Sequence, residues 1–427
     1  MRIVIAALLG VCLAGTALAA PEQSIPPKPR PGAPEERTIV LAQANSSNIA
    51  FERWIDRFRG RARSAGIRDA VFNAAFQGVR YNANVIQKDR NQSEFTKQIW
   101  EYLDSAASET RVKNGRAALR QNKRLLGEIE ARYGVEAEVV AAIWGLESAY
   151  GSFRGSEPLI EALATLAFDG RRGRFFESQL IAALKIIQAG DVPPRRMTGS
   201  WAGAMGHTQF IPTSYLSYAV DFRGDGKRDI WSDDPTDALA STAAYLKRFG
   251  WRKGQPWGVE VTLPRGFNYG LTGERVKKSP GDWAALGVRD TRGARVPNHG
   301  RASILLPAGA QGAAFMIFDN FHVIERYNTA AAYVIGVGHL SDRTRSRWGR
   351  RRPWMVVGVL PLGLVFAAVC LPPSHLSATG AEWWFGINTF LLFVFWTLVV
   401  IPYEALGPEL TYSYDGRNRL FAFREGG

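Results

Sequence analysis

One glutamate in this sequence stands in a setting suited to acid catalysis. Glu147 lies in the run WGLESAYG, residues 144–151, at the end of a stretch that follows one apolar helix face. Ile143, Trp144 and Leu146 give it apolar neighbours, and burial of this kind raises the pKa of a carboxylic acid toward the working pH. A protonated acid can supply the proton that the leaving oxygen of a glycosidic bond needs. The alternative is an ordinary surface or capping glutamate, the usual fate of this residue type.

A second run, further along the chain, offers groups that could hold a sugar. Residues 199–215 read GSWAGAMGHTQFIPTSY, and the small residues would let the backbone approach a ligand closely. Ser200 and Gln209 supply short, neutral hydrogen-bonding groups, which can orient an acetamido sugar without adding charge. Small residues alone would equally suit a tight contact between two helices. Taken with Glu147, the run indicates chemistry on a sugar polymer.

The run DFRGDGKRDIWSDD, residues 221–234, follows part of a calcium-loop pattern. Three aspartates fall at positions one, five and nine of the EF-hand loop: Asp221, Asp225 and Asp229. Position three is Arg223, where an oxygen ligand is needed, and position twelve is Ser232 instead of glutamate. A structural calcium ion and a turn held by aspartate side chains are both open at this point.

Helical periodicity dominates residues 48–342, where Phe51, Trp54, Ile55 and Phe58 share the spacing of one helix face. Further helices are predicted at residues 67–77, 94–103, 111–133, 137–148, 161–167, 175–189, 236–249 and 328–340. Short strands are predicted at residues 259–264, 302–309 and 313–320, within a β-rich insertion at about 257–320. The predicted fold class is therefore mainly α (α+β), a helical core with a small β insertion.

The two ends of the chain carry signals of another kind. Residues 1–20 combine a basic start, an apolar run and an Ala-Leu-Ala site, which indicate a cleaved secretory signal peptide, with an uncleaved anchor as the alternative. Residues 21–47 are proline-rich and predict a disordered linker. Apolar stretches at 354–371 and 383–402 are long enough for membrane helices, and the arginines outside them predict a hairpin with both ends cytoplasmic.

Composition narrows the class of partner. The net charge of +14 suits an anionic partner such as lipid or a cell-wall polymer, with a solvated basic surface as the alternative. Nucleic acid is not expected, because no zinc-finger or RNA-binding signature is present. The two cysteines, Cys12 and Cys370, lie in apolar stretches, so a cysteine-based metal site between them is excluded.

Together these motifs resemble the membrane-bound lytic transglycosylase B family. The two runs, the aspartate loop and the RYN triplet at 326–328 carry the resemblance, which covers about residues 48–343. It implies a lysozyme-like core that cleaves the MurNAc–GlcNAc bond of peptidoglycan without water, leaving 1,6-anhydroMurNAc ends. Glu147 matches the family's single catalytic glutamate, which acts as acid on the glycosidic oxygen and then as base on the C6 hydroxyl. The resemblance implies substrate-binding roles for Ser200, Gln209, Tyr327, Asn328, Arg171, Arg172 and Phe175. It requires no cofactor, and the family carries an EF-hand-like loop at the aspartate run.

The C-terminal part resembles a different family, the glycoside–pentoside–hexuronide:cation symporters. Residues 338–354 and 401–426 are similar to two loops of that family, but only two of its many membrane helices are covered. Both resemblances can be written through GHLSDR, residues 338–343, so we interpret the chain as a fusion. The catalytic domain is assigned to residues 48–342 and a transporter-like fragment, expected to be non-functional, to residues 343–427.

The sequence thus predicts a periplasmic lytic murein transglycosylase, attached to the membrane through its C-terminal hairpin and acting on peptidoglycan strands. The alternatives are a hydrolytic, lysozyme-like muramidase, an inactive peptidoglycan-binding protein and a sugar:cation symporter fragment. A hydrolase would need a second carboxylate about 5–9 Å from the first. Glu157, Glu161 and Asp169 lie near Glu147 in the sequence, but in less distinctive surroundings.

Overall fold

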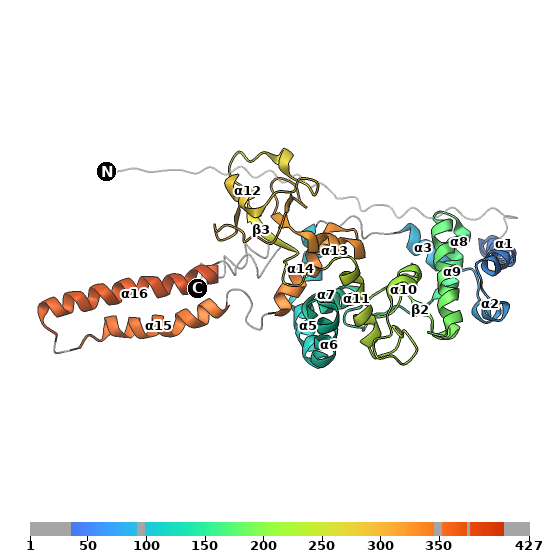
Figure 1. The fold of residues 1–427 in the computed structure, drawn as a ribbon, viewed down its shortest axis with the longest axis horizontal. Helices are drawn as coiled ribbons and strands as arrows, with labels where there is room; N and C mark the ends of the chain where they lie inside the picture. Colours follow the sequence, from blue (N-terminus) through green and yellow to red (C-terminus); the bar gives the residue numbers. More distant parts are fainter. Residues whose placement is uncertain (1–35, 92–98, 346–351, 374–375, 405–427) are drawn as a thin grey trace, which may run out of the picture. The chain divides into compact units, whose positions relative to one another are not determined.

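A computed structural model describes residues 36–91, 99–345, 352–373 and 376–404 (Figure 1). The predicted signal peptide, residues 21–35 of the predicted linker and most of the arginine-rich and C-terminal loops lie outside these residues. The chain divides into two compact units, Met1–Ile49 and Ala50–Gly427. Helix α1 (Glu36–Ser64) begins earlier than the expected start of order near residue 48. The helix can begin this early because residues 35–59 contain neither proline nor glycine, the two residues that most disfavour a helix.

Most of the described chain is helical. The predicted helices of the core are confirmed except the one at 111–133, and residues 94–98 of the helix predicted at 94–103 lie outside the described residues. The helices between α1 and the C-terminal pair are α2 (Asp69–Phe76), α3 (Ala83–Arg90), α4 (Ile99–Ala106), α5 (Glu109–Gln121), α6 (Lys123–Tyr133), α7 (Ala137–Ser148), α8 (Leu159–Asp169), α9 (Gly173–Ala189), α10 (Pro212–Tyr218), α11 (Thr236–Arg248), α12 (Pro280–Ala285), α13 (Asp319–Tyr327) and α14 (Ala331–Arg345). Short 3₁₀ turns lie at η2 (Pro194–Arg196) and η3 (Tyr269–Leu271).

Two local predictions need correction. The helix predicted at 111–133 is broken at Asn122, whose side-chain amide donates to the Ala118 carbonyl at 3.0 Å and competes with the helical hydrogen bonds. Helix α13 occupies residues 319–327, which overlap the end of the strand predicted at 313–320. There the apolar periodicity changes from that of a strand to that of a helix within a few residues. The predicted end of the strand therefore lies too far along the chain.

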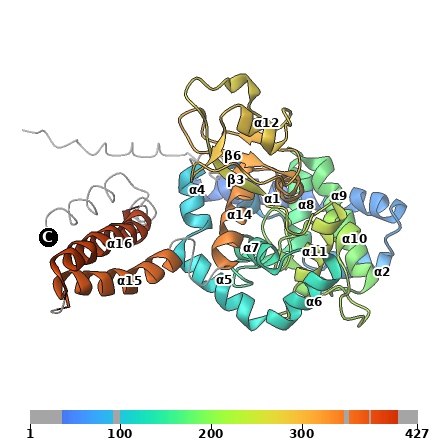
Figure 2. The ribbon, with the colours of Figure 1, turned by 60° about the vertical axis from the view of Figure 1, so that its left-hand side comes forward.

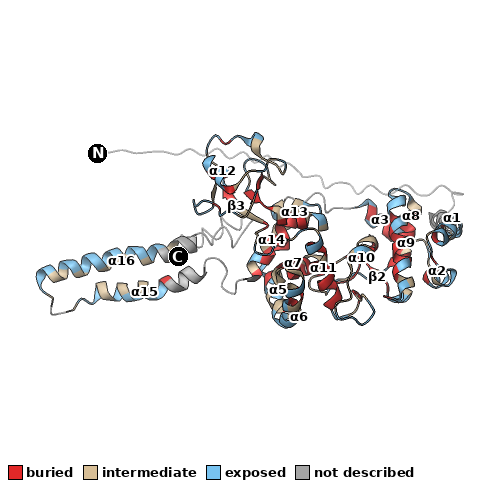
Figure 3. Ribbon diagram, viewed as in Figure 1, coloured by how far each residue is buried: buried red, intermediate tan, exposed pale blue. Residues whose placement is uncertain are grey.

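Helix α7 lies at the centre of the helical core (Figure 3). Its residues from Val139 to Gly145 are all buried, which is expected of a helix that is apolar on every side. It packs against α14, α5, α11 and α6. A two-stranded ladder, β1 (Glu157–Pro158) with β2 (Thr198–Gly199), holds the segment after α7 against the small-residue run.

The predicted β insertion is a four-stranded antiparallel sheet in the order β4-β3-β6-β5. Figure 2 shows its central strands β3 and β6. Its strands are β3 (Gly258–Thr262), β4 (Arg289–Asp290), β5 (Ser303–Leu305) and β6 (Ala314–Ile317). The sheet has its own apolar core around Trp283, whose side chain is fully buried and whose indole N–H donates to the Ala302 carbonyl at 2.9 Å. Trp257 joins the insertion to α14, where a Cβ at Gly338 would lie 2.1 Å from the Trp257 ring. Gly338 is therefore required for this contact.

Helix α14 runs through the string at which the two sequence resemblances meet. Leu340 is fully buried and Thr344 is nearly so. The Arg116 guanidinium donates to the Arg343 carbonyl at 2.7 Å. Residues on both sides of the predicted boundary at 342 are thus built into the helical core.

The two apolar stretches after α14 form helices α15 (Arg352–Cys370) and α16 (Ala378–Glu404), which pack against each other. Among the residues that the structure describes, no helix has both the length and the apolar character that crossing a bilayer demands. The predicted two-helix hairpin is confirmed as a pair of packed helices, and its crossing of a membrane stays a prediction. Pro361 lies inside α15, and the side chains of Asn388 and Thr397 in α16 donate to carbonyls of the same helix.

We expect Trp283→Ala to destabilise the β insertion by about 3–5 kcal/mol, because it leaves a cavity in a small core and removes a buried hydrogen bond. Urea unfolding followed by circular dichroism measures the change. Leu286→Ala is the matched control, since Leu286 is 41% exposed and its truncation should change the free energy of unfolding by less than about 0.5 kcal/mol. Equal effects from the two variants would contradict the assignment of this core.

Candidate active site

Glu147 occupies the last turn of α7, and the residues after it explain the run in which it lies. Ala149 and Tyr150 both have left-handed backbone conformations, with φ of 48° and 60°, so the helix stops directly after Ser148. The Tyr150 ring folds back over Gly145, where a Cβ would lie 2.5 Å from the ring. Its hydroxyl donates to the Arg111 carbonyl at 2.9 Å. Glycine and tyrosine at these positions therefore fix where α7 ends.

The Glu147 carboxylate meets a tyrosine from α14. The Tyr333 hydroxyl donates to Glu147 Oε1 at 2.6 Å, and the Tyr333 side chain is buried. Glu147 as a whole residue is half-buried. Burial of its carboxyl group raises the pKa of Glu147 to about 7, while the hydrogen bond from Tyr333 opposes this rise. Near neutral pH the group can therefore serve as an acid or as a base.

A second tyrosine lies in the same electrostatic environment. The Tyr327 hydroxyl donates to the Thr208 carbonyl at 2.5 Å, which ties the end of α13 to the small-residue run. Burial first, and then the nearby charge of Glu147, raises the pKa of both Tyr327 and Tyr333 well above the ordinary value. Both phenols therefore keep their protons and act as hydrogen-bond donors at neutral pH.

The small-residue run is fitted tightly to the segment after α7. A Cβ at Gly155 would lie 2.2 Å from the Gly199 backbone, so the two glycines allow an approach that no other residue could make. Ser200 Oγ accepts a hydrogen bond from the Ala204 N–H at 3.0 Å and lies half-buried beside this contact. The small residues can thus serve a tight backbone contact and still leave room for a ligand to approach.

Gln209 is held in an unusual conformation that fixes its amide group. Its φ is 54°, in the left-handed region that non-glycine residues rarely adopt. The side-chain Nε2 donates to the carbonyls of Gly206 at 2.8 Å and Arg154 at 3.1 Å. Both amide protons are then used, which leaves the side-chain carbonyl oxygen as the group that can accept from a ligand.

The other residues expected at the cleft make separate contacts. Arg171 pairs with the buried Asp89 at 2.6 Å. Arg172 lies over the Phe175 ring at 4.5 Å, and both side chains are exposed. Asn328 is exposed and its side chain accepts from the Ala330 N–H at 3.0 Å. Within the described ranges no hydrogen bond links these residues to Glu147, so their roles in binding remain predictions.

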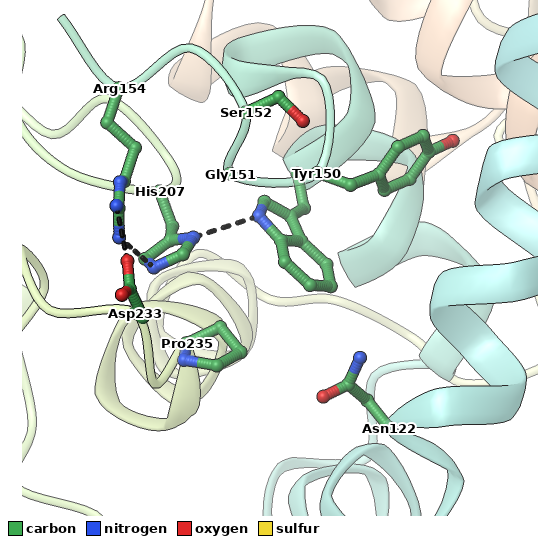
Figure 4. A pocket seen from close by; sticks show the side chains of 9 residues that line it. Asn122, Tyr150, Gly151, Ser152, Arg154, His207, Asp233 and Pro235 are labelled. Carbon is green, nitrogen blue, oxygen red and sulfur yellow. Dashed lines mark hydrogen bonds and ion pairs between the residues drawn. The ribbon is translucent and has the colours of Figure 1, made fainter.

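His207, to which the sequence assigns no role in the site, joins the two runs. The Trp144 indole N–H donates to His207 Nδ1 at 3.2 Å, and His207 Nε2 lies 2.8 Å from the Ser232 carbonyl. Ser148 Oγ donates to the His207 carbonyl at 2.5 Å. Burial lowers the pKa of His207, which favours the neutral ring that these bonds require. Trp144, His207 and Arg154 border a cavity of about 290 Å³ (Figure 4). Sequence reasoning missed Tyr333, since no motif surrounds it.

The nearby carboxylates of the hydrolase alternative have other partners. Glu157 pairs with Lys88 at 2.6 Å. The Asn82 amide donates to Glu161 at 3.0 Å, and Arg90 pairs with Asp169 at 2.8 Å. Burial, and not a neighbouring carboxylate, accounts for the raised pKa of Glu147, and the Tyr333 hydrogen bond opposes the rise. The geometry favours a single acid over a carboxylate pair.

The aspartate loop closes on its own backbone. Asp221 accepts from the N–H groups of Gly224, Asp225 and Gly226 at 2.6–3.2 Å, and these bonds, with Gly226 first, lower its pKa. Asp225 and Asp229 likewise accept from backbone N–H groups two residues on.

The remaining positions of this loop do not complete a calcium site. Arg223, at position three, pairs with Glu128 at 2.6 Å. Ser232, at position twelve, offers no bidentate carboxylate, and its hydroxyl lies 3.4 Å from the Asp234 carbonyl. The loop is therefore a poor fit to a full calcium shell, and the turn held by aspartate side chains explains its residues. Of the residues that the structure describes, a different group has converging metal-ligand atoms: Glu274, His322 and Glu325.

Comparison with known proteins places this arrangement in a family. The Transglycosylase SLT domain family matches residues 50–342, and the chain belongs to this family. Membrane-bound lytic murein transglycosylase B of Escherichia coli (strain K12) is 36% identical over 238 residues, covering 54% of this chain and 63% of that protein. The chain thus spans less than two thirds of the length of this relative.

Solved structures agree with this membership. The crystal structure of SltB3 from Pseudomonas aeruginosa in complex with NAG-anhNAM-pentapeptide shows 48% identity and a TM-score of 0.67, and the match covers 74% of this chain and 87% of that one. The Escherichia coli lytic transglycosylase Slt35 in complex with calcium shows 30% identity and a TM-score of 0.59, with 70% and 93% covered. The predicted lysozyme-type, mainly helical fold is confirmed.

The second resemblance is also confirmed. The MFS/sugar transport protein family matches residues 329–427, which overlap the first match in α14 and in the turn that precedes it. An uncharacterized symporter of Synechocystis sp. is 39% identical over 125 residues, covering 28% of this chain but only 21% of that protein. The C-terminal part is a symporter-like region.

We expect Tyr333→Phe to raise the pKa of Glu147, because it removes a hydrogen bond that favours the carboxylate. Activity that depends on protonated Glu147 falls as pH rises through that pKa, so the descending limb of the pH–rate profile should move up by about one pH unit. Tyr269→Phe, at an exposed tyrosine of the β insertion, should leave the profile unchanged. A downward shift in Tyr333→Phe would contradict the assignment.

The raised pKa of Glu147 also has a consequence for stability. A carboxyl group whose folded pKa is about 7, against 4.5 for the ordinary group, contributes stability that is complete below pH 4.5 and lost as pH rises to about 7. The free energy of unfolding of Glu147→Gln, relative to that of the wild type, should therefore increase between pH 5 and pH 8 by at most about 3 kcal/mol. Thermal unfolding at both pH values measures the gain, and a difference that does not change with pH would overturn the expectation.

Proposed function

We propose that the chain is a peptidoglycan lytic transglycosylase in which Glu147 is the single acid–base residue. The observation that supports this most directly is the half-buried carboxyl group with a pKa near 7, held at 2.6 Å by Tyr333. A group with that pKa has substantial populations of both protonation states near neutral pH, which one residue needs in order to act as acid and then as base. Membership of the transglycosylase family supports the same reaction.

The proposed reaction has two proton transfers. Protonated Glu147 donates its proton to the glycosidic oxygen between MurNAc and GlcNAc, and the bond from that oxygen to C1 of MurNAc breaks. The resulting carboxylate then takes the proton from the C6 hydroxyl of the same MurNAc, whose oxygen bonds to C1. The products are a free GlcNAc hydroxyl and a 1,6-anhydroMurNAc end, and Glu147 is again protonated. Tyr333 orients the carboxylate through both steps.

The binding residues are proposed from their free polar groups. The Gln209 side-chain carbonyl can accept an N–H or O–H from the sugar, since both of its amide protons are engaged. Ser200 and Asn328 add short polar groups, and Tyr327 adds a protonated phenol near Glu147. Arg172 and Phe175 form an exposed cation–aromatic pair on which a sugar ring or peptide carboxylate can lie. Arg171 acts mainly by fixing α3 through Asp89.

The substrate and compartment follow from the relatives and the N-terminus. A relative has been solved with a NAG-anhNAM-pentapeptide and another time with a NAG-NAM-pentapeptide, so peptidoglycan strands are the proposed substrate. The signal-peptide pattern of residues 1–20 supports export to the periplasm, where that polymer lies. Calcium has no step in the proposed reaction, although Slt35 was crystallised with it. A structural calcium at Asp221, Asp225 and Asp229 would need further oxygen ligands from water.

Mass spectrometry of digested sacculi tests the proposal. The wild type should release muropeptides with 1,6-anhydro ends, and Glu147→Gln should lower the rate by about 10³-fold or more, because no other group can deliver the proton. Glu138→Gln is the matched control, on the first turn of the same helix, and should keep its activity.

Other results would favour the alternatives. Reducing ends would indicate a hydrolytic muramidase. Pelleting on sacculi without cleavage would indicate a binding protein. Full activity of Glu147→Gln would refute the assignment of the acid. Circular dichroism of each variant excludes loss of the fold as the cause of lost activity.

A further inference from the structure

We propose that Glu274, His322 and Glu325 form a zinc site that clamps the β insertion to helix α13. One ligand atom from each of the three residues lies within 4.8 Å of the others. His322 and Glu325 are three residues apart on α13 and therefore share a face of the helix. Glu274 comes from a turn of the β insertion. None of the three residues has a role in the glycan chemistry.

The distances suit a small tetrahedral cation. His322 Nδ1 lies 3.1 Å from Glu325 Oε2 and 3.9 Å from Glu274 Oε2. Zinc bonds of about 2.0–2.2 Å to nitrogen and oxygen place tetrahedral ligand atoms about 3.4 Å apart. The observed atoms need only small side-chain rotations to reach that spacing. Three protein ligands would leave the fourth position to water.

The charges around His322 favour a cation at this position. Both glutamates approach the same imidazole nitrogen, which carries at most one proton and so can donate to only one of them. Among the ion pairs of the described residues, Glu274 and Glu325 pair with His322 and with no lysine or arginine. The nearby Lys277 and Arg252 pair instead with Asp319. A divalent cation would satisfy all three ligand atoms at once.

The surroundings hold the ligands in place and restrict the choice of metal. The three side chains are 26–40% exposed, so an ion could enter without unfolding. The Ser303 hydroxyl donates to the Glu274 carbonyl at 3.0 Å, which anchors the turn to strand β5. An imidazole among the ligands favours zinc over calcium or magnesium, which prefer oxygen ligands only.

The position of the site gives it a structural consequence. Helix α13 carries His322 and Glu325 and ends at Tyr327, whose hydroxyl holds the small-residue run through Thr208. Glu274 belongs to the insertion, which also contacts the helical core through Trp257 against Gly338 and through the Lys277–Asp319 ion pair. A bound zinc ion would therefore hold the Glu274 turn of the insertion against helix α13.

Metal analysis of the full-length protein, purified without a polyhistidine tag and stripped with a chelator, tests the proposal. After addition of zinc and gel filtration, the wild type should retain one zinc ion per chain by inductively coupled plasma mass spectrometry. Titration calorimetry should show at least tenfold weaker binding in His322→Ala and in the isosteric Glu325→Gln. His299→Ala is the matched control, a half-buried histidine of the same insertion outside the cluster, and should bind zinc as the wild type does.

The unfolding temperature with and without zinc distinguishes a specific zinc site from nonspecific binding. Zinc should raise the unfolding temperature of the wild type and of His299→Ala, but not of His322→Ala. If a helix variant fails to fold, Glu274→Gln, on a surface turn, still measures the loss of a ligand. Absence of stoichiometric zinc in the wild type, or equal affinity in Glu274→Gln and the wild type, would overturn the proposal.

Discussion

The contact between the Glu147 carboxyl group and the Tyr333 hydroxyl is the constraint on which the site depends. A carboxyl group removed from water strongly resists ionisation, and a single donor at 2.6 Å partly offsets that cost. The balance between the two effects sets a pKa near neutrality. It requires α7 and α14 to pack directly against each other, as they do. The apolar character of α7 on all sides thus serves the chemistry as well as the core.

The runs at residues 144–151 and 199–215 are held together by hydrogen bonds and close backbone contacts. His207 accepts the Trp144 indole N–H and receives the Ser148 hydroxyl on its carbonyl, so the second run is bonded to the helix that carries the acid. Gly155, just before β1, and Gly199, within β2, allow the two backbones to touch. Many of the small residues that could let a ligand approach the backbone are required for this packing. Their rigidity holds Gln209 in its strained conformation.

The sequence was most informative where the signal was local. The helix at 137–148 and its glutamate could be predicted because apolar spacing and a distinctive run fell together. Tyr333 could not, since it lies in an ordinary apolar helix and acquires its role only by tertiary packing. The aspartate loop was ambiguous, because a calcium loop and an aspartate-held turn use the same residues at the same spacing.

The pairing of Glu147 with Tyr333 also bears on the order in which the protein is made. The two residues are 186 positions apart, so their contact closes one of the longest loops in the helical core. A chain still being synthesised would hold the acid on its helix long before the tyrosine had emerged. The acid–base balance would then be completed only with α14, among the last elements of the core to fold. The acid–base pair of the proposed reaction is therefore complete only once α14 has packed against α7.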